Sequence, residues 1–244
     1  MYYFASDIHL GAGAEQSARN VETRFVEWLD CVGRDAKAIF LLGDIFDFWF
    51  EYRRVVPKGF VRTLAKLSEL TSRGVRVVML TGNHDMWVWD YLTKECGVEL
   101  YTKPFVESIA GKKLFMAHGD NMKIDGQPML KLMNRVFRSG VARTLFSWLV
   151  HPDLALKFGR WWSGKSRKSH GDRIPANVNE PLMEYISESL ADNGIDIAVF
   201  GHTHCAEESD VKGVRSIFLG EWESRPAYAV MDAEGNIELK FLNA

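Results

Sequence analysis

The stretch Ile39-Phe40-Leu41-Leu42-Gly43-Asp44-Ile45-Phe46-Asp47 decides how this chain folds. Its first four residues are apolar, which predicts a strand buried on both faces, and a glycine and an aspartate follow where that strand ends. Open α/β sheets bind their ligands beyond the carboxyl ends of their strands. Asp44 is therefore a candidate site residue.

The same pattern, an apolar run followed by polar residues, occurs at four further places in the chain. The polar segments that follow these runs are Asp7-Ile8-His9, Gly82-Asn83-His84-Asp85, His118-Gly119-Asp120 and Gly201-His202-Thr203-His204. We expect the five strand ends to present Asp, Asn and His side chains together.

The composition is that of an ordinary soluble globular protein, with 47% hydrophobic and 25% charged residues among 244. This length suits one large α/β domain, or a domain with an insertion, and it allows a sizeable core. A formal net charge of −2 gives no chain-wide reason to expect nucleic-acid binding. The composition thus indicates neither disorder nor a nucleic-acid partner.

The cysteines and the apolar runs bear on where the protein works. Cys31, Cys96 and Cys205 are odd in number and widely spaced, so we expect reduced thiols of a cytosolic protein. The first strand follows Met1 at once, and no apolar run reaches about 18 residues. The sequence therefore predicts neither a signal peptide nor a membrane-spanning helix.

Helical and strand patterns alternate through the first hundred residues. We expect helices over about 20–34, between Pro57 and Gly74, and over about 85–97. Strands are expected near 39–42 and 75–80, and short antiparallel strands near 98–101, 105–109 and 113–117. This order favours a layered α/β fold. Later in the chain we expect a helix near 178–192, a strand at 195–200, and sheet-edge strands near 214–219, 226–232 and 237–242.

Residues 121–176 interrupt this order with two or three amphipathic helices and no convincing strand. The segment holds eleven Lys and Arg against three Asp, a net charge of +8, which leaves −10 for the rest of the chain. We therefore expect a catalytic body of residues 1–120 and 177–244, covered by a helical cap of residues 121–176.

The strand ends carry seven side chains of the kinds that bind metals: Asp7, His9, Asp44, Asn83, His118, His202 and His204. Oxygen and imidazole ligands without thiolate suit two divalent ions such as Mn²⁺, Fe²⁺ or Zn²⁺. Two ions clamp a phosphate and lower the pKa of a bound water, and Asp44 is the natural carboxylate to bridge them. Each position alone fits a helix cap, a turn or a buried histidine, but the five segments together favour a metal centre.

In this order the segments resemble the motifs of the calcineurin-like metallophosphoesterase superfamily: D-x-H, G-D-x-x-D, G-N-H-D/E, a later H, and G-H-x-H. The resemblance implies a double β-sandwich flanked by helices. It implies one metal held by Asp7, His9, Asp44 and His204, and a second held by Asp44, Asn83, His118 and His202.

The same resemblance implies catalytic roles for two more residues. His84 would contact the scissile phosphate or protonate the leaving group, and Asp85 would orient His84. We expect Asp47 to hold His9 rather than a metal, or else to cap the following turn.

Within this superfamily the chain looks most like the UDP-2,3-diacylglucosamine pyrophosphatase family of lipid A biosynthesis. The similarity rests on His118-Gly119-Asp120, on the length of the cap with Arg143-Thr144-Leu145-Phe146, and on Ser163-Gly164-Lys165-Ser166-Arg167-Lys168. It implies that a hydroxide bridging two metals, usually Mn²⁺, attacks the α-phosphate and releases UMP and 2,3-diacylglucosamine 1-phosphate. The substrate contacts would be Asn83, His84, Ser163, Lys165, Lys168, Trp148 and Trp162.

The basic cap favours a phosphorylated or membrane-surface partner. The resemblance thus implies a glycolipid-nucleotide substrate and a peripheral position on the cytoplasmic face of the inner membrane. The apolar residues of the cap fit either an acyl-chain pocket or a small core of their own.

One residue departs from the closest family, because His84 stands where many of its members carry arginine. This leaves open a phosphoesterase for another lipid-linked or small nucleotide diphosphate. A non-catalytic metal-binding scaffold is a further alternative.

Overall fold

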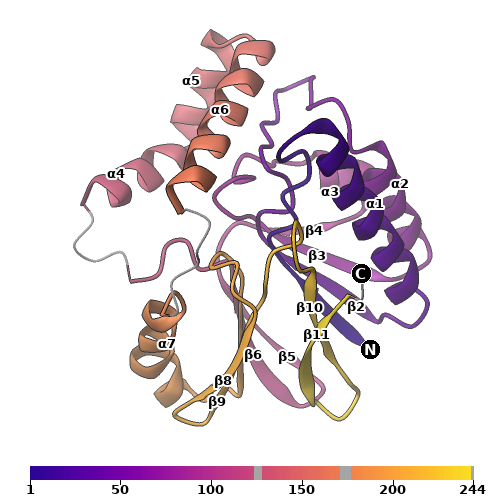
Figure 1. Ribbon diagram of the computed structural model, residues 1–244, viewed down its shortest axis with the longest axis vertical. Helices are drawn as coiled ribbons and strands as arrows, with labels where there is room; N and C mark the ends of the chain where they lie inside the picture. The colour runs from indigo at the N-terminus through magenta and orange to yellow at the C-terminus, as the bar shows by residue number, and fades with distance from the viewer. Residues whose placement is uncertain (124–127, 171–176, 243–244) are drawn as a thin grey trace.

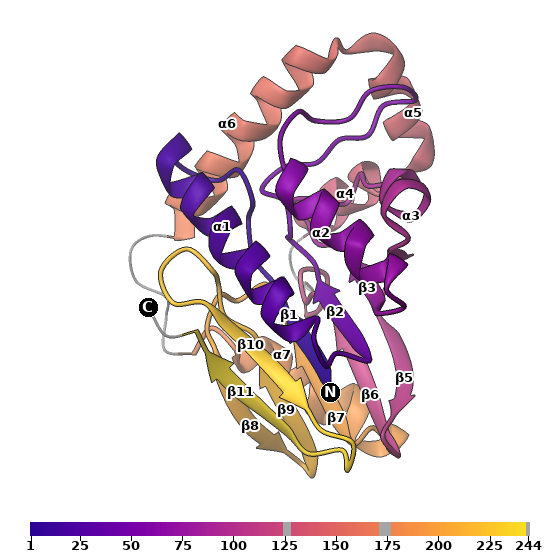
Figure 2. The same ribbon diagram turned by 90° about the vertical axis from the view of Figure 1, so that its right-hand side faces the viewer.

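Two β-sheets lie face to face in the centre of the molecule, and helices cover their outer surfaces (Figure 1, Figure 2). The computed structural model describes residues 1–123, 128–170 and 177–242. Within these ranges, the side chains of Leu130, Met133, Arg160, Trp162 and residues 165–170 are not described. The layered arrangement is the double β-sandwich that the family resemblance implies.

The first sheet has six strands in the order β11-β10-β1-β2-β3-β4. Their bounds are β1 (Tyr2–Ala5), β2 (Ala38–Leu42), β3 (Arg76–Leu80), β4 (Glu99–Tyr101), β10 (Ala227–Met231) and β11 (Ile237–Phe241). Strands β1 to β4 are parallel, and β10 pairs antiparallel with both β1 and β11. The helices that connect the parallel strands are α1 (Glu15–Val32), α2 (Val61–Ser72) and α3 (Tyr91–Cys96).

The second sheet has five strands in the order β5-β6-β7-β9-β8. Their bounds are β5 (Phe105–Ile109), β6 (Lys112–Ala117), β7 (Ile197–Phe200), β8 (Glu207–Val211) and β9 (Val214–Phe218). Strands β6, β7 and β9 are parallel, and β5 and β8 join as antiparallel edges. Helix α7 (Glu180–Tyr185) continues into a π-helical turn, Ile186–Leu190, and a 3₁₀ turn, Ala191–Asn193.

The apolar run of β2 is continuous because both faces of this strand are buried. Phe40 and Leu42 face the second sheet, whereas Ile39 and Leu41 face α1 and α2. All five residues of the strand are buried. A strand between two apolar layers reads as an unbroken apolar run, which is how β2 was recognised in the sequence.

Four strands differ from the sequence-based expectations. Strand β4 is parallel to β3 rather than part of an antiparallel group, and β9 and β10 lie inside their sheets rather than at the edges. Strand β8 was missed because its residues, Glu-Glu-Ser-Asp-Val, carry almost no apolar character. As an edge strand it buries too little surface to need that character.

Helix α3 begins at Tyr91, later than the expected start near residue 85. The buried carboxylate of Glu51 accepts hydrogen bonds from the backbone N–H groups of Trp89 (2.7 Å), Asp90 (3.0 Å) and Tyr91 (3.0 Å). A carboxylate from a distant loop therefore sets the start of this helix. The residues before it stay free to form the loop after β3.

The predicted insertion contains three helices, α4 (Pro128–Phe137), α5 (Gly140–Leu149) and α6 (Pro152–His170). They lie together beyond the loops that follow the strands, well apart from α7 (Figure 1). Among the described residues of this segment none belongs to a strand. No helix in the described part of the chain is both long enough and apolar enough to span a membrane.

Candidate metal centre

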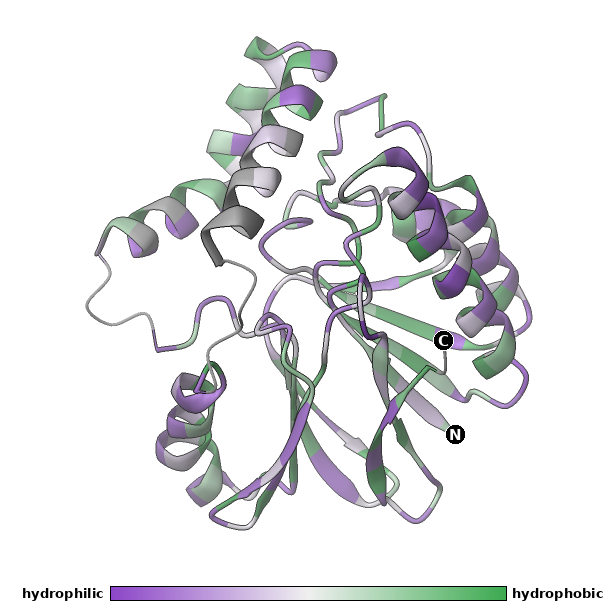
Figure 3. Ribbon diagram, viewed as in Figure 1, coloured by the Kyte–Doolittle hydropathy of each residue, from purple (hydrophilic) through white to green (hydrophobic). Residues whose placement is uncertain are grey.

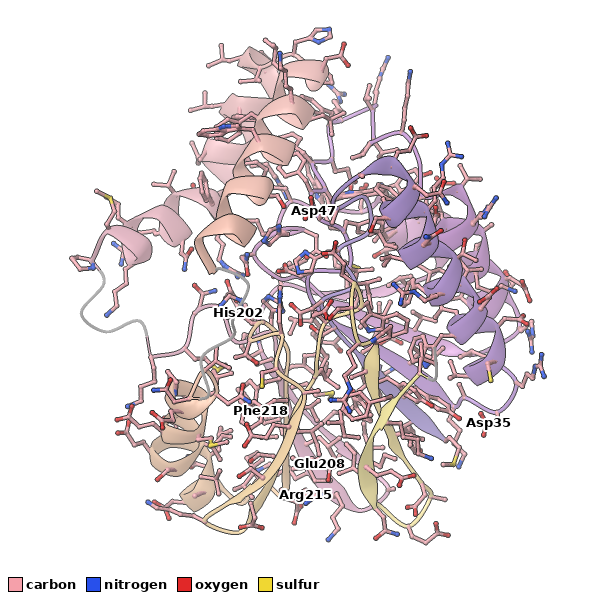
Figure 4. The ribbon with its side chains drawn as sticks, viewed as in Figure 1. Asp35, Asp47, His202, Glu208, Arg215 and Phe218 are labelled. Atoms are coloured by element: carbon pink, nitrogen blue, oxygen red, sulfur yellow. The ribbon has the colours of Figure 1, made fainter. Side chains whose placement is uncertain are left out.

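The loops at the carboxyl ends of five strands meet between the two sheets and the insertion helices. Asp7 and His9 follow β1, Asp44 follows β2, and Asn83 follows β3. The second sheet contributes the remaining expected ligands, which are His118 after β6 and His202 and His204 after β7. Figure 4 shows Asp47 beside the lower part of α6 and His202 at the loops above the second sheet.

Most of the expected ligands have a left-handed backbone. The φ angles are 55° at Asp7, 49° at His9, 53° at Asp44, 71° at His202 and 59° at His204. A residue other than glycine in this region costs of the order of 1–3 kcal/mol, and such residues gather at functional sites. Five of the seven expected ligands share this conformation, which indicates that the fold holds them for a purpose other than stability.

Asp44 lies at the middle of the cluster. Its Oδ2 is 3.3 Å from His118 Nε2, 3.8 Å from His9 Nε2 and 3.9 Å from His84 Nε2. Its Oδ1 accepts the backbone N–H of His84 at 2.8 Å. One carboxylate oxygen therefore faces three imidazole nitrogens, as a bridging ligand would.

Asp7 forms the second focus. Its Oδ1 is 3.3 Å from His204 Nε2 and 3.8 Å from His9 Nε2, and its Oδ2 accepts the backbone N–H of His202 at 2.9 Å. The Nε2 atoms of His9 and His204 are 3.1 Å apart. The carboxylate and two imidazoles thus surround one small space.

The two remaining ligands lie beside His118. Asn83 Oδ1 is 3.2 Å from His118 Nε2, and the rings of His118 and His202 meet edge to face with centroids 5.1 Å apart. The structure therefore brings all seven expected ligands into one cluster. Three overlapping groups of side chains have ligand atoms close enough to share an ion: Asp7 with His9 and His204, His9 with Asp44 and His84, and Asp7 with Asp44 and His118.

The donor set fits divalent cations. Asp7 Oδ1 is buried and finds no hydrogen-bond partner among the described residues. A buried polar atom without a partner is costly, and a cation between Asp7, His9 and His204 would satisfy Asp7 Oδ1 and both Nε2 atoms. The carboxylate and imidazole chemistry suits Mn²⁺, Fe²⁺ or Zn²⁺.

The pKa shifts show that the buried carboxylates and imidazoles of the site interact strongly. Burial raises the pKa of Asp44, but the imidazoles around it, His118 above all, bring it well below its usual range. Burial also acts to raise the pKa of Asp7, yet His204 lowers it to about 2. Both carboxylates are therefore charged at neutral pH, which favours a cation nearby.

The histidines respond to this charge in opposite ways. Burial lowers the pKa of His118, but the carboxylate of Asp44 overrides it and raises the pKa to about 10. Burial and then the charge of His118 lower the pKa of His202 to about 4. A proton on His118 balances Asp44 where a metal would otherwise do so, and His202 is held neutral, as a metal ligand must be.

Two glycines of the motifs are needed for close approach. A Cβ at Gly82 would lie 2.2 Å from Asp44 Oδ1, and a Cβ at Gly201 would lie 2.0 Å from Ser6 Oγ. Any larger residue would displace the loops that carry the ligands. The glycines in G-N-H-D and G-H-x-H are thus part of the site's geometry.

The prediction that Asp85 orients His84 is wrong. The buried Asp85 carboxylate accepts the backbone N–H groups of Gly82 (2.8 Å), Ile45 (2.8 Å) and Phe46 (3.3 Å), which ties the loop after β3 to the loop after β2. His84 Nδ1 instead lies 2.9 Å from the backbone carbonyl of Asp47. Burial, and then the charge of Asp44, raise the pKa of Asp85 to about 6.

Asp47 faces His9, as expected, with Oδ1 at 3.6 Å from His9 Nδ1. A hydroxyl from α6 reaches the same oxygen, because Ser163 Oγ donates to Asp47 Oδ1 at 2.5 Å. Sequence reasoning placed Ser163 against the substrate and missed this contact. The separation of 116 residues leaves no local signal for it.

The other expected substrate contacts are less defined. The side chains of Lys165, Lys168 and Trp162 lie outside the described residues. Trp148 is 84% exposed on α5, and its contact with substrate stays a prediction.

A cavity of about 410 Å³ opens beside Asp47, between the start of α6 and residues 55–60. Its walls are mainly apolar, with Leu10, Phe48, Val55, Phe60 and Leu156 among them. This cavity was not among the sequence-based expectations. Its only sequence signal was the run of apolar residues Val55, Val56 and Pro57 in a loop.

Comparison with known proteins agrees with this geometry. The family model described as calcineurin-like phosphoesterase matches residues 2–206. A UDP-2,3-diacylglucosamine hydrolase of Porphyromonas gingivalis is 38% identical over 94% of this chain and 93% of its own length. Hydrolases of the same name from Haemophilus influenzae and Pseudomonas putida are 27% and 28% identical, over 96% of this chain and 95% and 96% of their own. The chain therefore belongs to the calcineurin-like phosphoesterase family.

Proposed function

We propose that the protein hydrolyses the pyrophosphate bond of UDP-2,3-diacylglucosamine to UMP and 2,3-diacylglucosamine 1-phosphate. The observation that carries this proposal is the Asp44 carboxylate, which three imidazole Nε2 atoms face at 3.3–3.9 Å. The substrate comes from the hydrolase of that name that is 38% identical over 94% of the chain.

Two divalent ions, when bound, would neutralise the phosphate oxygens and make a water acidic enough to act as nucleophile. Asp7, His9, Asp44 and His204 would hold one ion, and Asp44, Asn83, His118 and His202 the other. The distances around Asp44 and Asp7 support this division. The donor set favours Mn²⁺, with Fe²⁺ or Zn²⁺ as alternatives.

His84 is placed to handle the phosphate. Its Nδ1 donates to the Asp47 carbonyl, so the ring presents Nε2 toward Asp44 and the centre of the site. In the imidazolium form of His84, the Nε2–H would be available to a phosphate oxygen or to the leaving-group oxygen. Asn83, which lies beside His118, would contact the substrate from the other side of the loop.

The cavity beside Asp47 suits an acyl chain of the substrate. It adjoins Asp47, which faces His9, and α6 supplies Pro152 and Leu156 to its wall. Lys58 and Lys157 also line it. An apolar pocket with a few polar groups is the usual form of a small-molecule site.

The insertion helices also suit the surface of a membrane, and we place the protein peripherally on the cytoplasmic face of the inner membrane. Exposed large apolar side chains of these helices include Met129, Leu132, Val141, Leu145, Trp148 and Leu149. Figure 3 shows hydrophobic residues along both α4 and α5. Exposed apolar residues next to basic ones favour an anionic lipid surface, where a lipid-linked substrate would be found.

The test is a Mn²⁺-supplemented assay that follows UMP release from UDP-2,3-diacylglucosamine and from UDP-N-acetylglucosamine. We expect rapid cleavage of the acylated substrate alone. No cleavage by a protein that has bound two metals would refute the proposal. Equal cleavage of both would favour a phosphoesterase for small nucleotide diphosphates, the alternative that His84 leaves open.

A further inference from the structure

Helix α6 lies against the body of the protein with a narrow face of small residues. Ala155, Gly159 and Ser163 follow one another at intervals of four, and all three are buried. A Cβ at Gly159 would lie 2.4 Å from the ring of Phe48, so no larger residue fits there without movement. The small residues thus bring the helix axis close to the loop after β2, and Ser163 is the last of them.

Ser163 meets this loop at Asp47. Ser163 is only 1% exposed, and its hydroxyl donates to Asp47 Oδ1 at 2.5 Å. A charge-assisted hydrogen bond of this length holds the carboxylate in one rotamer. The contact is polar, short and shielded from solvent, unlike the exposed charged pairs elsewhere on the surface.

Asp47 in turn contacts two imidazoles of the metal centre. Its backbone carbonyl lies 2.9 Å from His84 Nδ1, and its Oδ1 is 3.6 Å from His9 Nδ1 and 3.8 Å from His84 Nδ1. The Nε2 atoms on the far side of both rings face Asp44. Asp47 therefore contacts the Nδ1 side of the His9 and His84 rings, and its position affects the direction in which their Nε2 atoms point.

We propose that Ser163 is a positioning residue that acts through Asp47 on His9 and His84. In this role α6 completes the metal centre itself, and the hydroxyl of Ser163 matters for the hydrolysis of every phosphoester. The inference rests on the metal centre of the proposed function but not on the choice of UDP-2,3-diacylglucosamine as substrate. A direct contact between Ser163 and the substrate, by contrast, would matter only for ligands that reach α6.

The test compares Ser163→Ala with wild type on bis(p-nitrophenyl) phosphate and on UDP-2,3-diacylglucosamine, both with Mn²⁺. We expect kcat to fall roughly tenfold on both substrates, since loss of such supporting groups costs about 10–100-fold. KM should stay within about twofold, and Mn²⁺ affinity measured by calorimetry should fall. Ser163→Thr, which keeps the hydroxyl, should restore most of the activity.

Tyr52→Phe is the matched control. It also removes one hydroxyl between the body and the insertion, because Tyr52 Oη donates to the Val150 carbonyl at 3.0 Å, but it does not touch Asp47. We expect its kcat on the small diester to equal that of wild type. An equal loss in Tyr52→Phe and Ser163→Ala would show general loosening of the insertion and overturn the proposal.

A double-mutant cycle keeps the proposal testable if Ser163→Ala is poorly folded alone. In an Asp47→Asn background, Ser163→Ala should lower kcat less than about twofold further, because its route to the imidazoles is already broken. Multiplicative losses would overturn the proposal. So would an effect confined to the KM of the acylated substrate, which would make Ser163 a substrate contact and leave the proposed activity intact.

Discussion

In the proposed metal centre Asp44 would join the two halves, because its two oxygens face different partners. Oδ1 accepts the backbone N–H of His84 at 2.8 Å, which fixes the carboxylate, and Oδ2 then faces His9, His84 and His118. A carboxylate anchored in this way is held for the cations before they bind. Pre-organisation of this kind is what a two-metal site requires.

Asp44→Asn should therefore remove the charge that both ions of the proposed centre would share. We expect activity on any phosphodiester to fall by more than about 100-fold, which exceeds the usual loss for a residue outside the ligand set. Calorimetry with Mn²⁺ should show fewer than two ions per chain. Asp30→Asn is the control, because Asp30 pairs with Lys66 on α1 and α2, away from the centre. An Asp44→Asn protein that binds two ions and turns over normally would contradict the assignment.

Gly82→Ala should disturb the same carboxylate by steric contact alone. Its Cβ would lie 2.2 Å from Asp44 Oδ1, so either the loop or the carboxylate must move. We expect a loss of about 1–3 kcal/mol in the free energy of unfolding, typical of overpacking, together with a large loss of turnover. Gly140→Ala meets no atom within 4 Å and should change neither quantity. Thermal melts of the two variants would measure the change in stability, and diester assays would measure the change in turnover.

At the scale of elements, the apolar strands that support the site were predictable, and the elements that depend on contacts between distant residues were not. Strands β2 and β7 show as apolar runs because every residue in them is buried. Strand β8 is polar and gave no such signal. The start of α3 depends on Glu51, and the place of α6 depends on Ser163 and Asp47, so both rest on contacts between distant residues.

The same division holds for the site itself. The clustering of all seven candidate ligands could be predicted because each lies within a few residues of the end of an apolar run, and parallel strands bring such positions to one edge. The role of Asp85 could not be predicted, because its hydrogen-bond partners are backbone N–H groups in two separate loops. A pattern of side chains does not reveal such partners.

An aromatic cluster attaches α5 to the body. The ring of Phe146 lies 5.0 Å from that of Phe50 and 5.4 Å from that of Trp87, centroid to centroid. Phe146→Ala should cost about 2–4 kcal/mol of local stability, somewhat below the range for a fully buried phenylalanine. Hydrogen exchange should then accelerate in α5 and leave β2 unchanged. Trp148→Ala, on the exposed side of the same helix, should have little effect on exchange. Uniform acceleration throughout the chain would show that the insertion does not unfold as a separate unit.

At the scale of the whole molecule, charge and exposed apolar surface are concentrated in one region. Residues 121–176 carry a net charge of +8 in a chain whose total is −2. The apolar residues exposed on α4 and α5 belong to the same region. A substrate with acyl chains must leave a lipid surface to reach Asp44, and this region offers the surface with the matching chemistry.

Trp148→Ser should therefore weaken binding to vesicles rather than hydrolysis in solution. Trp148 is 84% exposed, and insertion of a large apolar side chain is worth about 1.5–3 kcal/mol, so we expect roughly 10- to 100-fold weaker partitioning into vesicles containing phosphatidylglycerol. Partitioning of the wild type should fall as salt rises, because the basic residues contribute. Val106→Ser, at an exposed position of β5 in the second sheet, is the control and should partition as wild type does. Turnover of bis(p-nitrophenyl) phosphate should be equal in all three proteins. If Trp148→Ser bound vesicles as tightly as wild type, the membrane-facing surface would have to be sought away from α5.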